Sequence, residues 1–112
     1  MNLELAHRAV ACKHWRWMPG MLHGTVISDK LKSCYRISDL TLHVDADRVP
    51  DLDDPATQGC LLELVRKAWG DQRTNTLPTT DGGWAVADGD DDWICTGTTE
   101  VAALVAALEA AP

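Results

Sequence analysis

The chain has 112 residues, of which 46% are hydrophobic, and a formal net charge of −7. A chain of this length forms one core, so we expect a single domain over residues 1–112. No uncharged run approaches the ~18 residues of a membrane span, and charged residues interrupt the apolar pattern of the first ten residues, so we expect a cytoplasmic protein without membrane contact.

Charge is distributed unevenly along the chain. Residues 1–36 contain six Lys or Arg and two acidic residues, whereas residues 37–112 contain four Lys or Arg and fifteen acidic residues. Carboxylates repel phosphates, so direct binding of duplex nucleic acid is disfavoured unless the basic first third forms a separate face. The acidity suits a basic partner instead.

The chain has five tryptophans, one tyrosine and no phenylalanine, so aromatic packing falls to Trp15, Trp17, Trp69, Trp84 and Trp93. The four cysteines stand singly, without a CxxC pair, which favours reduced, mostly buried thiols at Cys12, Cys34, Cys60 and Cys95.

The first expected element is a helix. Apolar residues recur at helical spacing over residues 3–13, with Asn2 as a suitable N-cap, and the helix must end before the turn signal Pro19-Gly20. The composition then changes to short runs of Thr, Val, Ile and Tyr, which predicts half-buried strands at 21–27, 34–37 and 40–44. The polar residues 28–33 could form the turn of a hairpin between the first two strands.

The second half begins with an aspartate- and proline-rich segment, 45–56, which we predict to be loop. Asp54-Pro55 begins the clearest helix of the chain and Gly70 ends it, because apolar residues recur between them at helical spacing. After it we expect a connector at 71–81, a strand hairpin formed by 82–88 and 92–97, and a last helix beginning at 98–100.

Three amphipathic helices and several antiparallel strands can bury their apolar sides only in layers. The order of elements therefore predicts an α+β fold, a small α/β sandwich in which an antiparallel sheet of about four to five strands packs with three helices.

Three blocks of the chain, LAHRAVACKHWRWMPGM, DLDDPATQGCLLELVRKAWGD and TEVAALVAALEAAP, resemble small tailed-phage and prophage proteins with the phage ABA sandwich domain. The resemblance implies an antiparallel sheet between helices and a phage accessory role. Some small phage proteins of this kind inhibit bacterial defence, and the resemblance adds that possibility here.

The segment HWRWMPGML is the first candidate site. Trp15 and Trp17 share one face if the segment is extended, and the simplest interpretation is that they cover one end of the core. Alternatively an exposed indole beside Arg16 stacks a base and pairs a phosphate, or serves as an anchor for a protein partner. The candidate binding residues are Trp15, Arg16, Trp17, Met18 and Met21.

Two aspartate-rich loops form the second candidate site. Charge runs are usually solvated surface, but loops that faced the same way would form a negative patch mimicking nucleic acid toward a basic groove. The candidate residues are Asp51, Asp53, Asp88, Asp90, Asp91 and Asp92.

Metal-binding and catalytic patterns are weak. Cys12 and His14 are too closely spaced to match a zinc ligand pair, even with His23 nearby. The repeat of Asp88, Asp90 and Asp92 lacks the glycine and glutamate of a calcium loop. No catalytic signature is present either, so we expect no metal, no cofactor and no enzymatic activity.

Three functions fit these features. The first is a non-enzymatic phage inhibitor that binds a host defence protein through the Trp/Arg segment, the acidic loops or both. The second is a sponge that traps a signalling nucleotide, cyclic or of ADP-ribose type, between the subunits of a homodimer. The third is a structural or regulatory phage accessory protein.

Overall fold

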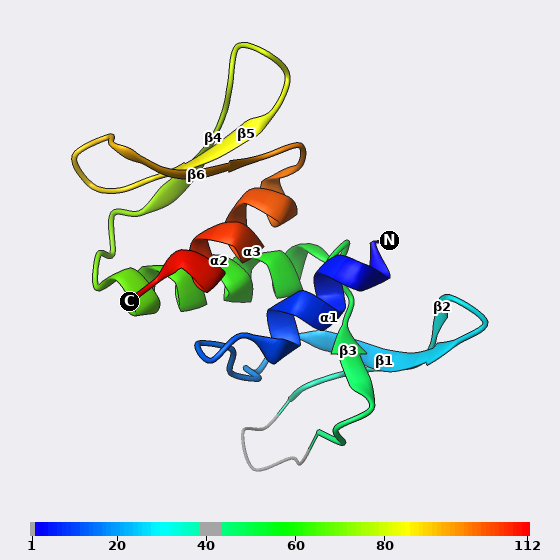
Figure 1. Cartoon of the computed structure of the whole chain (residues 1–112). Coiled ribbons are helices and arrows are strands. Elements are labelled where there is room, and N and C mark those ends of the chain that lie inside the picture. Colours follow the sequence, from blue (N-terminus) through cyan, green and yellow to red (C-terminus); the bar gives the residue numbers. More distant parts are fainter. Residues whose placement is uncertain (1, 39–43) are drawn as a thin grey trace.

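Three helices lie between two small antiparallel sheets in the computed structural model, which describes residues 2–38 and 44–112 (Figure 1). The elements are α1 (Leu3–Ala11), β1 (Leu22–Ile27), β2 (Lys30–Arg36), β3 (Arg48–Pro50), α2 (Pro55–Trp69), β4 (Asn75–Pro78), β5 (Trp84–Ala87), β6 (Trp93–Gly97) and α3 (Glu100–Ala110). Sheet A has the strand order β2-β1-β3 and sheet B has the order β4-β5-β6.

Each helix begins at a polar side chain that accepts a backbone hydrogen bond. The Asn2 side chain accepts from the Leu5 amide at 3.1 Å and caps α1, and the Thr99 hydroxyl accepts from the Ala102 amide at 3.1 Å and caps α3. Asp54 caps α2 in the same way, and Gly70 ends α2 with the positive φ of 67° that favours glycine. The helix boundaries expected from Asn2, Asp54 and Gly70 are therefore confirmed, as is the start of the last helix expected at 98–100.

Helix α3 provides the centre of the core. Apolar residues cover nearly all of its sides, and those buried are Val101, Ala103, Leu104, Val105, Ala107 and Leu108. Sheet B packs on one side of α3. Helices α1 and α2 pack on its other sides. A Cβ added at Gly97 of β6 would lie 2.6 Å from the Ala103 nitrogen, so sheet B approaches the α3 backbone too closely for any other residue. On another side, the Trp69 indole of α2 donates to the Ala107 carbonyl at 2.8 Å.

The start of α2 joins the helices to sheet A. The Thr57 hydroxyl accepts from the Leu22 amide of β1 at 2.9 Å. Arg36 of β2 donates to both carboxylate oxygens of Asp54, at 2.8 and 2.9 Å. The guanidinium group of Arg36 holds the pKa of the Asp54 carboxyl well below its usual range. One carboxylate therefore caps the helix and binds the edge strand of the sheet.

The α+β class and the layered packing are confirmed, but the described residues contain six strands instead of four to five, and these form two sheets. Strand β3 lies inside the segment predicted to be loop, and β4 lies inside the predicted connector. Both strands are too short, at three and four residues, to show alternation between apolar and polar positions.

Two further boundaries differ from the expectation. The first hairpin turns at Ser28 and Asp29 alone, with positive φ angles of 53° and 60°, so β2 begins earlier than predicted. Helix α1 ends at Ala11, not at residue 13. Residues 40–43 of the expected strand 40–44 lie outside the described residues. Within the described part, no helix is long and apolar enough to cross a membrane.

The five tryptophans, to which the sequence assigns the aromatic packing, do not dominate the core. Trp15 is buried, Trp17, Trp69 and Trp84 are half-buried, and Trp93 is exposed. Alanine, leucine and valine fill the core instead, because helices and sheets that approach as closely as α3 and sheet B leave little room for an indole.

Replacing Asp54 separates its two contributions to stability. We expect D54A to lower the free energy of unfolding by more than about 1 kcal/mol, because it removes both the cap and the ion pair. D54N keeps a capping acceptor and should lose less. Urea unfolding measures both effects.

The pH dependence follows from the lowered pKa of Asp54, which folding depresses from the ordinary value of 3.8. The advantage of the wild type over D54N should be complete at neutral pH and should shrink as the pH falls from about 4 toward 2. Equal losses for D54A and D54N, independent of pH, would contradict the double role.

Candidate functional site

Trp93 is exposed on the outer face of sheet B. It pairs with Ala87 across β5 and β6, and the register shifts between Val86 and Ala87. Val86 is fully buried in the core beneath sheet B, and its neighbour Ala87 points to the opposite face. The register shift therefore turns Trp93 away from α3, and 57% of its side chain stays in contact with solvent.

The turn between β5 and β6, residues 88–92, contains four aspartates and directly precedes Trp93 in the chain; we call it the acidic turn. One carboxylate has a structural role, since Asp88 Oδ1 accepts from the amides of Asp90 and Asp92 at 2.9 and 3.1 Å. Asp91 adopts the positive φ of 63° that aspartate tolerates in turns. The side chains of Asp90, Asp91 and Asp92 are consequently exposed at the tip.

The acidic turn is fixed to the end of α2. Asp71 Oδ2 accepts from the Gly89 amide at 2.9 Å, and Asp71 Oδ1 accepts from the Arg73 amide at 2.9 Å. These backbone hydrogen bonds lower the pKa of the Asp71 carboxyl and keep it charged. Arg73 approaches Asp90 at 3.9 Å. Residues 71–100 hold seven acids and this single base, so the region stays strongly negative.

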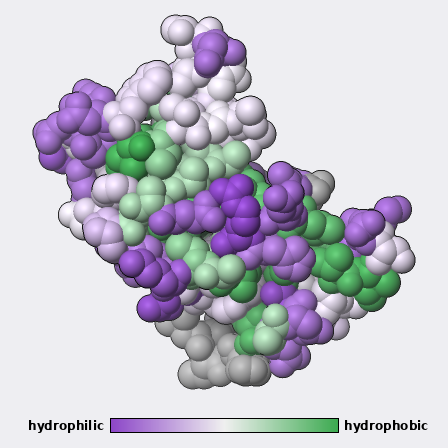
Figure 2. All heavy atoms as spheres, viewed as in Figure 1, coloured by the Kyte–Doolittle hydropathy of each residue, from purple (hydrophilic) through white to green (hydrophobic). Residues whose placement is uncertain are grey.

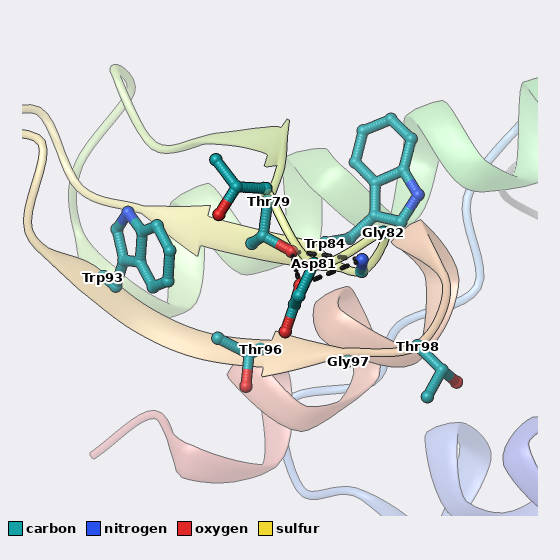
Figure 3. A pocket seen from close by; sticks show the side chains of 10 residues that line it. Thr79, Asp81, Gly82, Trp84, Trp93, Thr96, Gly97 and Thr98 are labelled. Carbon is teal, nitrogen blue, oxygen red and sulfur yellow. Dashed lines mark hydrogen bonds between the residues drawn. The ribbon is translucent and has the colours of Figure 1, made fainter.

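A cavity of about 600 Å³ lies beside Trp93, between the β4–β5 turn and β6 (Figure 3). Threonine, glycine, Asp81 and two tryptophans line it, with the Trp93 and Trp84 rings toward opposite ends. The Asp81 carboxylate accepts from the Thr79 hydroxyl and from the Gly83 amide at 3.2 Å, which lowers its pKa and keeps it ionised. An aromatic ring, hydroxyl groups and a carboxylate suit a cationic or hydrogen-bonding side chain of a partner.

The Trp/Arg segment does not form one surface, which corrects the candidate set. Trp15 is 6% exposed and Met21 is fully buried, so both belong to the core. The Arg16 guanidinium donates to the carbonyls of Lys13 and Trp15 at 3.0 and 2.7 Å and therefore holds its own segment together. Of the candidates, Arg16 is exposed, and Trp17 and Met18 are half-buried.

Trp17 packs edge-on against Trp15, with ring centroids 5.3 Å apart, and against His23, at 5.6 Å. His23 is 5% exposed and its Nδ1 accepts from Arg48 Nε. Burial, and then the charge of Arg48, lower the pKa of His23, so the imidazole is neutral and carries its proton on Nε2. This cluster closes one end of sheet A.

The two acidic loops lie at opposite ends of α2. Asp51 and Asp53 precede the N-cap Asp54, whereas the acidic turn is bonded to Asp71, just beyond the C-terminus of α2. Fifteen residues of helix separate the two ends by about 22 Å. The loops therefore do not form the joint negative patch that the sequence left open.

Among the described residues, no three His, Cys, Asp or Glu side chains are grouped as metal ligands. His14 bonds the Ala111 carbonyl and Cys12 the Leu108 carbonyl, away from His23. The four cysteines are free thiols; Cys34 is exposed, and three are half-buried. Burial raises the pKa of Cys60 and of Cys95, which makes these thiols poor nucleophiles.

Comparison with known proteins finds no matching family model, no matching curated protein and no matching solved structure. The arrangement of residues around Trp93 and the cavity is thus the basis for assigning a function.

Sequence reasoning found the acidic turn but missed Trp93, which was expected in the core. The available signal was its position directly after three consecutive aspartates, since a side chain next to an exposed charged tip is rarely buried deeply. Sequence reasoning also gave no sign of the cavity, because residues 71–81, which contribute to its lining, were expected to be a connector.

The neutral, buried His23 predicts a loss of stability at mildly acidic pH. The unfolded chain takes up a proton near the ordinary pKa of 6.5 and the folded chain does not, so the free energy of unfolding should fall as the pH drops below that value. H23Q retains an acceptor for Arg48 but cannot be protonated, and it should lose less stability over the same range. Urea midpoints at several pH values measure this; identical pH profiles for both proteins would show that His23 is not held neutral.

Proposed function

We propose that this chain is a non-enzymatic binding protein that engages a basic surface of a protein partner through Trp93 and the acidic turn. The observation that carries the proposal is the 57% exposure of an indole that directly follows three exposed aspartates, Asp90, Asp91 and Asp92, in the chain. Tryptophan is enriched among the few residues that carry most of the binding energy at protein interfaces.

The site has the anatomy of a small interface. Trp93 provides an aromatic centre, the adjoining cavity of about 600 Å³ adds hydroxyl groups and the Asp81 carboxylate, and the acidic turn provides a charged rim. The hydrogen bonds of Asp88 and Asp71 fix the rim before a partner arrives, so little conformational freedom is lost on binding. Negative potential at the rim accelerates association with a basic partner.

The partner class follows from the resemblance of three sequence blocks to phage accessory proteins. We propose that the chain acts in the cytoplasm of an infected bacterial host as an inhibitor of a defence component. Many such components handle nucleic acid and therefore present basic grooves, which the exposed carboxylates would occupy in place of phosphates.

The nucleotide-sponge function stays a prediction without support from this geometry. The cavity beside Trp93 is not lined by Trp15, Arg16 or Trp17, and the carboxylate of Asp81 in it repels phosphate. The structural or regulatory accessory role also stays a prediction, and the next experiment separates it from defence inhibition.

The test is phage plating on bacterial hosts that carry single nuclease-based defence systems and express this chain. We expect the wild type to raise plating on a susceptible defence host, and W93A to abolish the effect, because truncating a central tryptophan weakens binding about 30-fold or more. D90N/D91N/D92N should also lose it. Asparagine preserves the turn geometry, and the structural Asp88 is left intact.

The matched control is D29N/D51N/D53N, which removes the same number of charges far from Trp93. It should retain the wild-type effect, and circular dichroism should show all variants folded. Absence of any effect on every defence host, or equal effects of W93A and the wild type, would overturn the proposal.

A further inference from the structure

One face of sheet A carries a row of exposed cationic and aromatic side chains. Cross-strand partners share a face of a sheet, and alternate residues of β1 lie on the same side. The pairs on this face are His23 with Tyr35, Thr25 with Lys32, and Ile27 with Lys30.

The row depends on a β-bulge. Tyr35 and Lys32 are three residues apart, so in a regular strand they would point to opposite faces. The register shifts between His23 and Thr25, and Ser33 adopts a positive φ of 54°. The extra residue brings Tyr35 onto the same face as Lys32 and Lys30.

The face is open to solvent. Tyr35 is 63% exposed and Ile27 is 55% exposed, and together with Trp93 they are the exposed large hydrophobic side chains of the described residues. Lys30 and Lys32 are exposed beside them. Figure 2 shows the hydrophobic surface over the β1–β2 hairpin, at the right of the view, with hydrophilic residues around it.

Arg48 supplies a third, fixed cation on this face. It pairs with Thr25 across β1 and β3, and its guanidinium lies 5.4 Å from the centre of the Tyr35 ring. It donates to His23 Nδ1 and to the carbonyls of His23 and Ser33. The side chain is therefore held in place beneath the aromatic ring, as a cation–π contact requires.

We propose that this face binds single-stranded nucleic acid. An exposed aromatic ring stacks on a base of any sequence, and neighbouring cations pair with the phosphates that follow it along the strand. Tyr35 provides the stacking platform, while Lys30, Lys32 and Arg48 provide the positive track. Lys30 and Lys32 of the basic first third of the chain lie on this face together with Arg48 of β3, so the face carries positive charge although the net charge of the chain is −7.

Two alternatives fit the face less well. Addition of an acidic peptide strand to the edge of β2 is opposed by the bulge at Ser33, whose carbonyl already accepts from Arg48. Duplex nucleic acid keeps its base faces stacked internally, so the Tyr35 ring would gain no partner from it.

The test is fluorescence anisotropy with labelled twelve-residue oligo(dT) and oligo(U), a duplex of equal length, and a labelled poly-glutamate peptide. We expect the single strands to bind at low salt, more tightly than the duplex or the peptide, with affinity falling as salt rises. Y35A should weaken binding about tenfold, and Y35F, which keeps the ring, should not. The relative affinity of the two oligonucleotides distinguishes DNA from RNA.

Charge variants complete the test. K32E should weaken binding strongly, whereas K67E, which makes the same charge change on the exposed side of α2, should have little effect. W93A should bind like the wild type, so failure of the acidic site and failure of this face are distinguishable. No binding of single strands at low salt, equal binding by Y35A and the wild type, or tighter binding of poly-glutamate would overturn the proposal.

Discussion

Helix α3 must be buried on nearly every side, and the rest of the fold depends on this constraint. A helix with apolar residues all round cannot lie at a surface, and each fully buried leucine or valine contributes roughly 1.5–3 kcal/mol. Sheet B reaches the α3 backbone because Gly97 has no side chain to hold it away. The inner face of sheet B is thereby buried against α3. Its outer face, with Trp93, stays available to interact with other molecules.

The same layering separates the charges of the molecule. The helices lie between the two sheets (Figure 1), so the acidic turn on sheet B and the basic row on sheet A are held apart by packed helices. Charges of opposite sign that are separated in this way do not neutralise each other, since screening limits surface interactions to about 8–10 Å at physiological salt. Each face keeps its own field, and each can attract a partner of its own kind.

Helices were predictable from the sequence and the small strands were not. Asn2, Asp54, Gly70 and Thr99 mark helix ends by local hydrogen bonds or by local backbone geometry, and such signals need no tertiary contact. Strands β3 and β4 exist because β1 and β5 lie beside them, and this pairing leaves no pattern in three or four residues. The division into two sheets follows from the same long-range contacts.

The candidate sites show the same limit. The acidic turn was visible as composition, but the exposure of Trp93 results from a register shift in sheet B, and the face of Tyr35 results from a bulge in sheet A. A shift of one residue moves a side chain to the other side of a sheet, and neither shift is signalled by residue type. The exposure of Trp93 is thus an outcome of strand register.

The central claim is that one indole, Trp93, stands in solvent within a negative field. Fluorescence quenching by caesium and by iodide, compared between the wild type and W93F, tests it most directly, because a negative surface attracts the cation and repels the anion. We expect the wild type to show a fluorescence component that caesium quenches and iodide hardly quenches. This component should be absent from W93F. Equal quenching of both proteins by caesium, or stronger quenching of that component by iodide, would contradict it.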